Sequence, residues 1–209
     1  MKDIIIVGAG GFGREAYYRI KAVNAVEPTW NIKGFINDVP VDLRSKKIDL
    51  PILGTISDWR PSDNEVFAMG ISSPLGKAKV ASILKSKGAQ FATVIHPMAI
   101  VEETAVLGEG CMISRGSTVG DCAVLGDFVN IAGSMVGQDA EIGDFSTTTG
   151  YANITNAKLG KRVFVGSHAV ILNDRKIGDD AFICAGSIVF HHVKPGIKVW
   201  GNPARRVDW

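Results

Sequence analysis

Residues 101–131 read VEETAVLGEGCMISRGSTVGDCAVLGDFVNI. An aliphatic residue returns at every sixth position of this stretch, at Val101, Leu107, Ile113, Val119, Leu125 and Ile131. A period of six fits neither the 3.6-residue period of an amphipathic helix nor the alternation of a hairpin strand. It fits short strands joined by tight turns, the arrangement of a parallel β-helix built from hexapeptide repeats. Each repeat is expected to stack its aliphatic side chain on the repeat below, so that one continuous core forms.

The repeat continues beyond residue 131, with two steps of five residues in place of six. The later positions of the repeat are Val136, Ile142, Thr148, Ile154, Leu159, Val165, Ile171, Ile177, Ile183 and Val189. Glycine commonly follows the aliphatic residue, as at Gly108, Gly126 and Gly160. Because glycine adopts backbone conformations that other residues resist, we interpret these glycines as turn residues.

Composition and charge narrow the class of protein. The 23 Lys and Arg residues nearly balance the 21 Asp and Glu residues, and no basic block or stripe stands out. We therefore expect neither a nucleic acid nor a membrane as a partner. The apolar run Ile4–Val7 is too short for a signal peptide or a membrane span. Cys111, Cys122 and Cys184 lack the spacing of zinc ligands and indicate free thiols in a reducing cytosol, so we expect a cytoplasmic protein without a metal ion.

The pattern changes near residue 95 and predicts two domains, residues 1–95 and residues 96–209. The first has the alternating strands and helices of an α/β, Rossmann-like domain. Strands are predicted over residues 3–7, 32–36 and 65–71, with helices over residues 14–23 and 75–87 and a candidate fourth strand over residues 91–95. The fold class is thus an α/β domain followed by a parallel β-helix, with Trp200 and Trp209 interpreted as apolar contacts that cap its end.

A glycine motif lies between the first predicted strand and the first predicted helix. It reads Gly8-Ala9-Gly10-Gly11-Phe12-Gly13, which is G-x-G-x-x-G. In this context backbone N–H groups and the helix N-terminus face a phosphate. A segment of about 95 residues is closer to one mononucleotide-binding half than to the paired halves that hold a dinucleotide. The pattern therefore favours a nucleotide or nucleotide-sugar over NAD or a purely structural turn, and Asn37-Asp38 after the second strand suits a ribose or sugar hydroxyl.

The two halves together resemble a known family. An N-terminal Rossmann-like domain, the linker Val94–Pro97, the hexapeptide β-helix and the ending Gly201–Arg205 resemble the bacterial nucleotide-sugar acetyltransferases grouped with the sialic acid O-acetyltransferases, the NeuD/PglD-like family. The resemblance covers essentially the whole chain. It implies a left-handed coil, a homotrimer, acetyl-CoA in the cleft between neighbouring subunits, and an amino-sugar nucleotide held by the N-terminal domain, in a glycan biosynthesis pathway of a bacterium.

The resemblance also implies roles for particular residues. The expected substrate-binding residues are Gly8, Gly10, Gly11, Phe12, Gly13, Asn37, Asp38 and Asn130. The expected acetyl-CoA-binding residues are Thr147, Gly166, Gly186 and Arg205, with Arg205 near the adenine and 3′-phosphate. The candidate catalytic residues are Gln138 and Asp139, which stand at family positions, and His168, which is a candidate from its own place in the repeat.

The chain departs from the family where the chemistry is carried out. The family's catalytic base is a histidine in a G-H-D/E pattern, and Gln138 stands at that position. A second family histidine, near the thioester, corresponds to Thr147. Glutamine cannot accept a proton at neutral pH. A sugar amine, which is partly unprotonated near neutral pH, needs less help from a base than a hydroxyl does, so the sequence favours N-acetylation.

Several alternatives stay open. His168 projects from the repeat and is a candidate replacement base or CoA contact, whereas His96, in the linker, is interpreted as structural. With a different base, the protein would be an O-acetyltransferase of a sialic-acid-like sugar. A further alternative is a non-catalytic or poorly active member that still binds a nucleotide-sugar. A gamma-class carbonic anhydrase shares the hexapeptide coil, but the histidine spacing and the added N-terminal domain argue against it.

Overall fold

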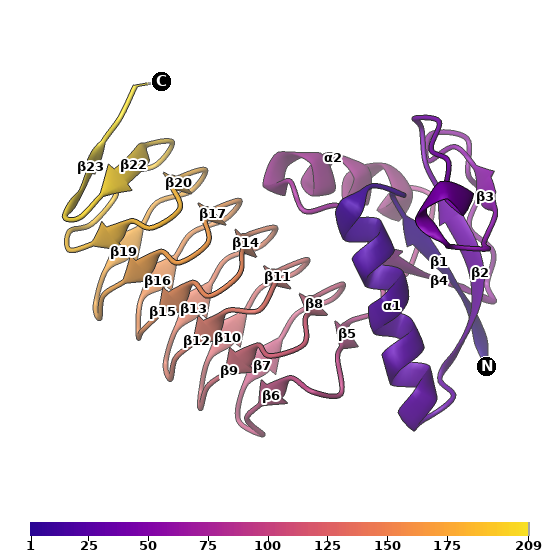
Figure 1. The fold of residues 1–209 in the computed structure, drawn as a ribbon, viewed down its shortest axis with the longest axis horizontal. Helices are drawn as coiled ribbons and strands as arrows, with labels where there is room; N and C mark the ends of the chain where they lie inside the picture. Colours follow the sequence, from indigo (N-terminus) through magenta and orange to yellow (C-terminus); the bar gives the residue numbers. More distant parts are fainter. Residues whose placement is uncertain (209) are drawn as a thin grey trace.

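A computed structural model describes residues 1–208, and Trp209 lies outside the described residues. The chain folds into an N-terminal α/β part and an elongated parallel β-helix that extends away from it (Figure 1). The predicted β-helix is therefore confirmed.

The N-terminal part is a four-stranded parallel sheet with strand order β3-β2-β1-β4. Its strands are β1 (Lys2–Val7), β2 (Trp30–Ile36), β3 (Ile52–Gly54) and β4 (Glu65–Met69). Helix α1 (Gly11–Val26) connects β1 to β2, a short 3₁₀ helix spans Arg44–Lys46, and α2 (Pro74–Lys85) follows β4. Helix α1 packs with one apolar cluster on the sheet and α2 with another, so the two helices bury different parts of it.

Three parallel sheets form the sides of the β-helix, and each is named here by its first strand. The β5 sheet contains β5 (Val94–Ile95), β8 (Met112–Ile113), β11 (Asn130–Ile131), β14 (Thr147–Thr148), β17 (Phe164–Val165), β20 (Phe182–Ile183), β22 (Lys198–Gly201) and β23 (Ala204–Arg206). The β6 sheet contains β6 (Ile100–Val101), β9 (Thr118–Val119), β12 (Met135–Val136), β15 (Asn153–Ile154), β18 (Val170–Ile171) and β21 (Ile188–Val189). The β7 sheet contains β7 (Val106–Leu107), β10 (Val124–Leu125), β13 (Glu141–Ile142), β16 (Lys158–Leu159) and β19 (Lys176–Ile177). Within residues 1–208 the only antiparallel pair is β22 with β23, a hairpin at the end of the β5 sheet.

The aliphatic repeat positions form the core of the β-helix, as the sequence predicts. From Ile113 to Val189, each is at most 5% exposed, including Thr148. Each is the second residue of a two-residue strand, and the first residue of the same strand points outward. Parallel strands pair in register between successive coils, as Thr148 does with Val165 and Val165 with Ile183.

Glycine is required at the second repeat position for a different reason from the predicted one, as Gly160 shows. Gly160 does not adopt a left-handed backbone; the left-handed residue of this turn is Arg162, with φ of 57°. A Cβ on Gly160 would lie 2.2 Å from Oδ1 of Asp179 in the next coil. That oxygen accepts the N–H of Lys161 at 3.0 Å. The interpretation as a conformational requirement was wrong here, because close approach between coils excludes a side chain.

The core can be tested with two adjacent residues of β19. Ile177 is 2% exposed and points inward, whereas the Lys176 side chain points outward. Ile177→Ala should lower the free energy of unfolding by about 2–5 kcal/mol, and Lys176→Ala should change it by less than about 0.5 kcal/mol. Urea denaturation followed by circular dichroism measures both. Equal effects of the two substitutions would contradict the inward orientation of the repeat.

The two parts share their apolar contacts at the junction. Phe91 packs edge-on against Phe128 of the β-helix, with ring centroids 4.9 Å apart, and Phe128 stacks on Phe145 at 5.2 Å. The candidate strand at 91–95 divides here: Phe91 bridges to Phe67 of the N-terminal sheet, and Val94–Ile95 already belongs to the first coil. The boundary at residue 95 stays a prediction.

Neither helix within residues 1–208 is long and apolar enough to cross a membrane. Trp200, which the sequence interpretation places as an apolar cap, is 56% exposed.

Candidate active site

The glycine motif connects β1 to α1 through a tight loop. Gly8 has φ of +91° and donates its N–H to the carbonyl of Ile36 at 2.8 Å. Asn37 Oδ1 accepts the N–H of Ala9 at 3.0 Å, so the end of β2 holds the loop in place. Gly10 is the N-cap residue of α1, and no side chain caps this end of the helix. The first-turn N–H groups of α1 therefore remain available to an acceptor.

A cavity of about 260 Å³ opens over this loop. Its lining comes from the loop and from the segments that follow β2, β3 and β4: Gly8, Gly10, Gly11, Phe12, Asn37, Ile56, Gly70, Ile71, Ser72 and Ser73. Space beside Gly10 and Gly11 is open, because a Cβ on either would meet nothing within 4 Å. Gly13 lies behind the loop, packed against Gly8. The predicted substrate-binding residues Gly8, Gly10, Gly11, Phe12 and Asn37 thus line one cavity.

Asp38 is engaged within the protein. Its Oδ1 accepts the N–H groups of Ile56 at 2.7 Å and Ser57 at 3.4 Å, and it therefore fixes the segment that closes one side of the cavity. The structure places this carboxylate beside the cavity without making it part of the lining.

A second cavity of about 410 Å³ adjoins the first one through Ser72 and Ser73. One wall is the start of α2, and the opposite wall is the β-helix, with lining residues Ser72, Ser73, Pro74, Leu75, Arg162, Phe164, Asp180, Ala181 and Phe182. Phe164 and Phe182 form a stacked pair with centroids 4.7 Å apart, and Phe182 is 38% exposed. This second cavity is a groove with an aromatic surface, and it shares Ser72 and Ser73 with the glycine-loop cavity.

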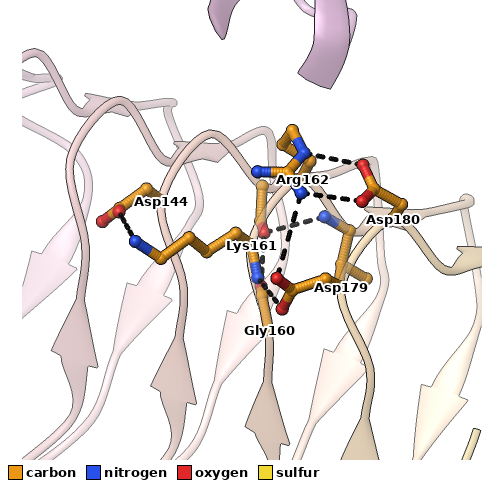
Figure 2. Close-up of polar contacts among 8 residues, drawn as sticks. Asp144, Gly160, Lys161, Arg162, Asp179 and Asp180 are labelled. Carbon is orange, nitrogen blue, oxygen red and sulfur yellow. Dashed lines mark hydrogen bonds and ion pairs between the residues drawn. The ribbon is translucent and has the colours of Figure 1, made fainter. Parts of the chain in front are cut away.

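Arg162 and Asp180 form the polar side of this groove, and a second ion pair, Lys161 with Asp144, lies next to it (Figure 2). Arg162 Nε and Nη2 donate to the two carboxylate oxygens of Asp180, each at 2.7 Å. This hydrogen bonding lowers the pKa of Asp180, so the carboxylate is ionised at neutral pH. Lys161 pairs with Asp144 at 2.8 Å. Burial opposes the charge of Asp144, but hydrogen bonds from Lys161 and the Asp127 N–H outweigh it and lower the pKa of Asp144.

Asn130 and Thr147 lie deeper, in the seam between the two parts. Asn130 Nδ2 donates to the Ile71 carbonyl at 3.1 Å, and Thr147 Oγ1 donates to the Ser72 carbonyl at 2.7 Å. Lys77 of α2 donates to Thr147 Oγ1 and to the Ser146 carbonyl, both at 2.8 Å. Burial lowers the pKa of Lys77 well below its usual range. Thr147, expected at the acetyl-CoA site, is 1% exposed in the single chain and holds the N-terminal part against the β-helix.

The three predicted catalytic residues do not meet within one chain. Gln138 and Asp139 are exposed in the turn between β12 and β13, on the edge between the β6 and β7 sheets. His168 is exposed in the turn between β17 and β18, on the edge between the β5 and β6 sheets, and it stacks on Tyr151 with centroids 5.1 Å apart. The side of the β6 sheet separates the two groups.

The remaining expected acetyl-CoA residues lie on the same edge as His168 or at the end of the coil. Gly166 packs against the next coil, since a Cβ would lie 2.5 Å from the N atom of Ala185. Gly186 has φ of +70° and open space beside it. Arg205 lines a cavity of about 360 Å³ whose other cationic or ionisable lining residues are His191, His192, Lys194 and Arg206. Among residues 1–208, no group of three His, Cys, Asp or Glu side chains could hold a metal ion.

Sequence reasoning missed Ser72, Ser73, Lys77, Arg162, Phe164, Asp180 and Phe182. For the stacked pair Phe164 and Phe182, the repeat pattern in the sequence contained a signal. Asn130, Thr147, Phe164 and Phe182 occupy the same outward repeat position on consecutive strands of the β5 sheet. Large or polar residues in line on one face mark the surface that α2 covers. Lys77 carried no comparable signal, because a lysine in a helix is ordinarily solvated.

No family model matches the chain. A probable serine acetyltransferase 1 of Oryza sativa is 34% identical over 129 residues, which is 60% of this chain and 38% of that protein. Serine acetyltransferase 4 of Arabidopsis thaliana is 30% identical over 135 residues, 64% of this chain and 35% of that protein. The chain thus matches little more than a third of these relatives' length.

Solved structures match over the full length of the chain. The acetyltransferase domain of PglB from Neisseria gonorrhoeae has a TM-score of 0.88 at 20% identity, covering 99% of this chain and 100% of that one. PerB from Caulobacter crescentus, in complex with CoA and GDP-perosamine, has a TM-score of 0.89 at 20% identity, covering 100% and 98%. WeeI from Acinetobacter baumannii has a TM-score of 0.82 at 25% identity, covering 99% and 100%. The two matches at 20% identity show a shared fold across both parts of the chain.

Proposed function

We propose that this protein is an acetyl-CoA-dependent N-acetyltransferase that acts on a nucleotide-linked amino sugar. The observation that carries the proposal is the junction of two cavities at Ser72 and Ser73, one over a glycine loop and one against the β-helix. A ligand with a nucleotide at one end and a sugar at the other would place the nucleotide in the glycine-loop cavity and the sugar in the groove. The PglB domain and PerB, with acetyl coenzyme A or with CoA and GDP-perosamine bound, support the same reading.

The N-terminal part, residues 1–95, is proposed to act as a Rossmann-like nucleotide-sugar domain. The diphosphate would lie at the open side of Gly10 and Gly11, where first-turn N–H groups of α1 carry partial positive charge. The sugar would then extend past Ser73 into the groove. Phe164 and Phe182 offer an apolar face for stacking, and the ionised Asp180 offers an acceptor for an amine.

Acetyl transfer in this site relies on positioning and on an amine nucleophile. Gln138 can orient a substrate but cannot remove a proton. The neutral sugar amine would attack the thioester carbonyl and expel the CoA thiolate, and the amine proton would pass to water or to a carboxylate such as Asp139. Loss of general-base help costs about 10² to 10⁴ in rate. We therefore expect a slow enzyme rather than an inactive one.

A homotrimer is proposed from the side chains of the β6 sheet. Its outward residues are Ile100, Thr118, Met135, Asn153, Val170 and Ile188, none of which is charged. The outward residues of the β7 sheet include Glu141, Lys158 and Lys176. If copies pack through the β6 sheet, the edge with Gln138 of one copy approaches the edge with His168 and Gly186 of the next. Acetyl-CoA would then bind between copies.

Direct assay tests the function. The full chain is incubated with acetyl-CoA and a panel of UDP-, dTDP- and GDP-linked amino sugars, and released CoA thiol and product mass are measured. The proposal expects one acetyl group added to the amine of at least one nucleotide-sugar. Acetylation of a sialic-acid-like hydroxyl would identify the O-acetyltransferase instead. Thermal stabilisation by a nucleotide-sugar without CoA release would identify a binding protein, the alternative that the absence of a histidine at position 138 leaves open.

The pH profile should follow the substrate rather than a protein base. Activity is expected to rise with pH as the sugar amine loses its proton, and His168→Ala should leave both the profile and kcat/KM unchanged. If His168 is instead the base, the substitution will lower kcat/KM by about 10² to 10⁴. Gln138→His should be tolerated and should increase kcat at neutral pH. Tyr151→Ala, which removes the ring that stacks on His168, controls for loss of local structure.

A further inference from the structure

A separate cavity of about 370 Å³ lies on the other side of the N-terminal part, where α1 meets the first two coils. Its lining residues are Glu15, Tyr18, Arg19, His96, Ser114 and Arg115. None of them lines the glycine-loop cavity or the groove. The acetyl-transfer mechanism proposed above assigns no role to these six residues.

Arg19 brings a buried guanidinium to the cavity wall, where its carbon lies over the Phe12 ring, 5.4 Å from the ring centroid. The residue is 4% exposed, and its Nη2 donates to Ser114 Oγ. Its Nη1 is buried and has no hydrogen-bond acceptor. Burial lowers the pKa of Arg19 to about 10, with Glu15 opposing the shift, yet no carboxylate in residues 1–208 forms an ion pair with the guanidinium. Burial of an arginine without a counter-ion is costly, which indicates a site for a bound anion.

The other lining residues suit an oxyanion. Arg115, on the turn after β8, adds a second guanidinium at the exposed side of the cavity. His96 Nδ1 accepts the N–H of Met98 at 3.0 Å, so the proton of the neutral ring is on Nε2. Burial, Arg19 and Arg115 all lower the pKa of His96. Ser114 and Tyr18 add hydroxyl groups, and only Glu15 carries negative charge.

We propose that this cavity is a binding site for a phosphate group. Phosphate accepts several hydrogen bonds at once, and guanidinium groups match its geometry. The bound phosphate would compensate the charge of Arg19 across the cavity wall and meet Arg115 and His96 directly. The site holds either free phosphate or a phosphate of a larger ligand such as CoA. Its position in the seam between α1 and the β-helix would link ligand binding to the contact between the two parts.

The pKa of the His96 imidazole can be used to measure whether phosphate occupies the cavity. The full chain is titrated with inorganic phosphate at constant ionic strength while the pKa of His96 is followed by NMR, with His96→Asn used to assign the signal among the four histidines. Phosphate should raise this pKa by about one pH unit, because an adjacent anion favours the imidazolium. Arg115→Gln should weaken phosphate binding about tenfold. Glu15→Gln should strengthen it, and Lys79→Gln, on the exposed side of α2, should have no effect.

Two further arms distinguish the source of the phosphate. If CoA raises the pKa of His96 at lower concentration than phosphate does, and dephospho-CoA does not, the ligand is the 3′-phosphate of CoA. A response to inorganic phosphate alone identifies a free-anion site. The proposal is overturned if neither phosphate nor CoA shifts the pKa of His96. An equal response in wild type and Arg115→Gln would also overturn it.

Discussion

Gly13→Ala should unfold the glycine loop and abolish nucleotide-sugar binding. A Cβ at this position would lie 1.9 Å from the carbonyl oxygen of Gly8, which is far inside contact distance. Neither neighbour can move away. The N–H of Gly8 is bonded to the Ile36 carbonyl, and Gly70, whose added Cβ would lie 2.8 Å from Gly13 Cα, is bonded through its N–H to Val7. Overpacking of this kind against backbone should cost more than about 3 kcal/mol.

Gly11→Ala is the matched control, two residues earlier. It lies in the first turn of the same helix, and an added Cβ would meet nothing within 4 Å. Alanine is a better helix former than glycine by about 1 kcal/mol, so stability should be equal or greater. Urea denaturation without ligand compares the stability of the two variants, because Gly11 itself lines the proposed nucleotide cavity. Similar stability of both would show that the loop does not have the close packing described here.

Lys77→Met should change how stability depends on pH. The folded-state pKa of Lys77 lies well below 10.5 because the amine is buried, whereas the unfolded chain has the ordinary value. Between these two values the unfolded chain binds a proton that the folded chain does not. The wild-type free energy of unfolding therefore rises with pH in this window, by at most about 1.4 kcal/mol per pH unit for this one group. Below the folded-state pKa the contribution is constant.

The methionine variant has no such proton. Relative to Lys77→Met, the wild type should gain stability as pH rises toward 10.5, and urea denaturation at several pH values measures the difference. Lys79→Met, on the exposed side of the same helix, should keep the wild-type slope. Parallel slopes for wild type and Lys77→Met would contradict a buried amine that loses its proton easily. The same experiment examines the seam, since Lys77 donates across it to Ser146 and Thr147.

The β-helix could be predicted because each repeat is a local pattern. Ile113 and Val189 lie at distant ends of the chain's second part, yet both obey the same six-residue rule and both are buried. The reason for the repeat glycines could not be predicted in this way. The Asp179 carboxylate that excludes a side chain at Gly160 comes from the next coil, about one full turn away in sequence. The short strand β3 carried too weak a pattern to be identified.

The candidate site was only partly predictable for a related reason. Gly8, Gly10, Gly11 and Asn37 follow a motif whose residues are close in sequence, and they line one cavity. The groove depends on how α2 packs on the coil, and this places Ser73 opposite Asp180. A local sequence pattern does not predict how segments that are distant in sequence pack together. The placement of Thr147 in the seam follows from the same packing, through the Ser72 carbonyl and Lys77.

The hairpin of β22 and β23 has a consequence for how the protein behaves at high concentration. If the last coil of a parallel β-helix is uncovered, its edge strands present unpaired backbone N–H and C=O groups. Strands of another molecule can pair with these groups, and repeated end-to-end pairing would form a filament. Here the chain reverses at Gly201–Ala204, and the antiparallel strand occupies that template with Arg205 and Arg206 on its outer edge. The hairpin therefore blocks end-to-end strand pairing at the β5 sheet, independently of any contact that Arg205 makes with a ligand.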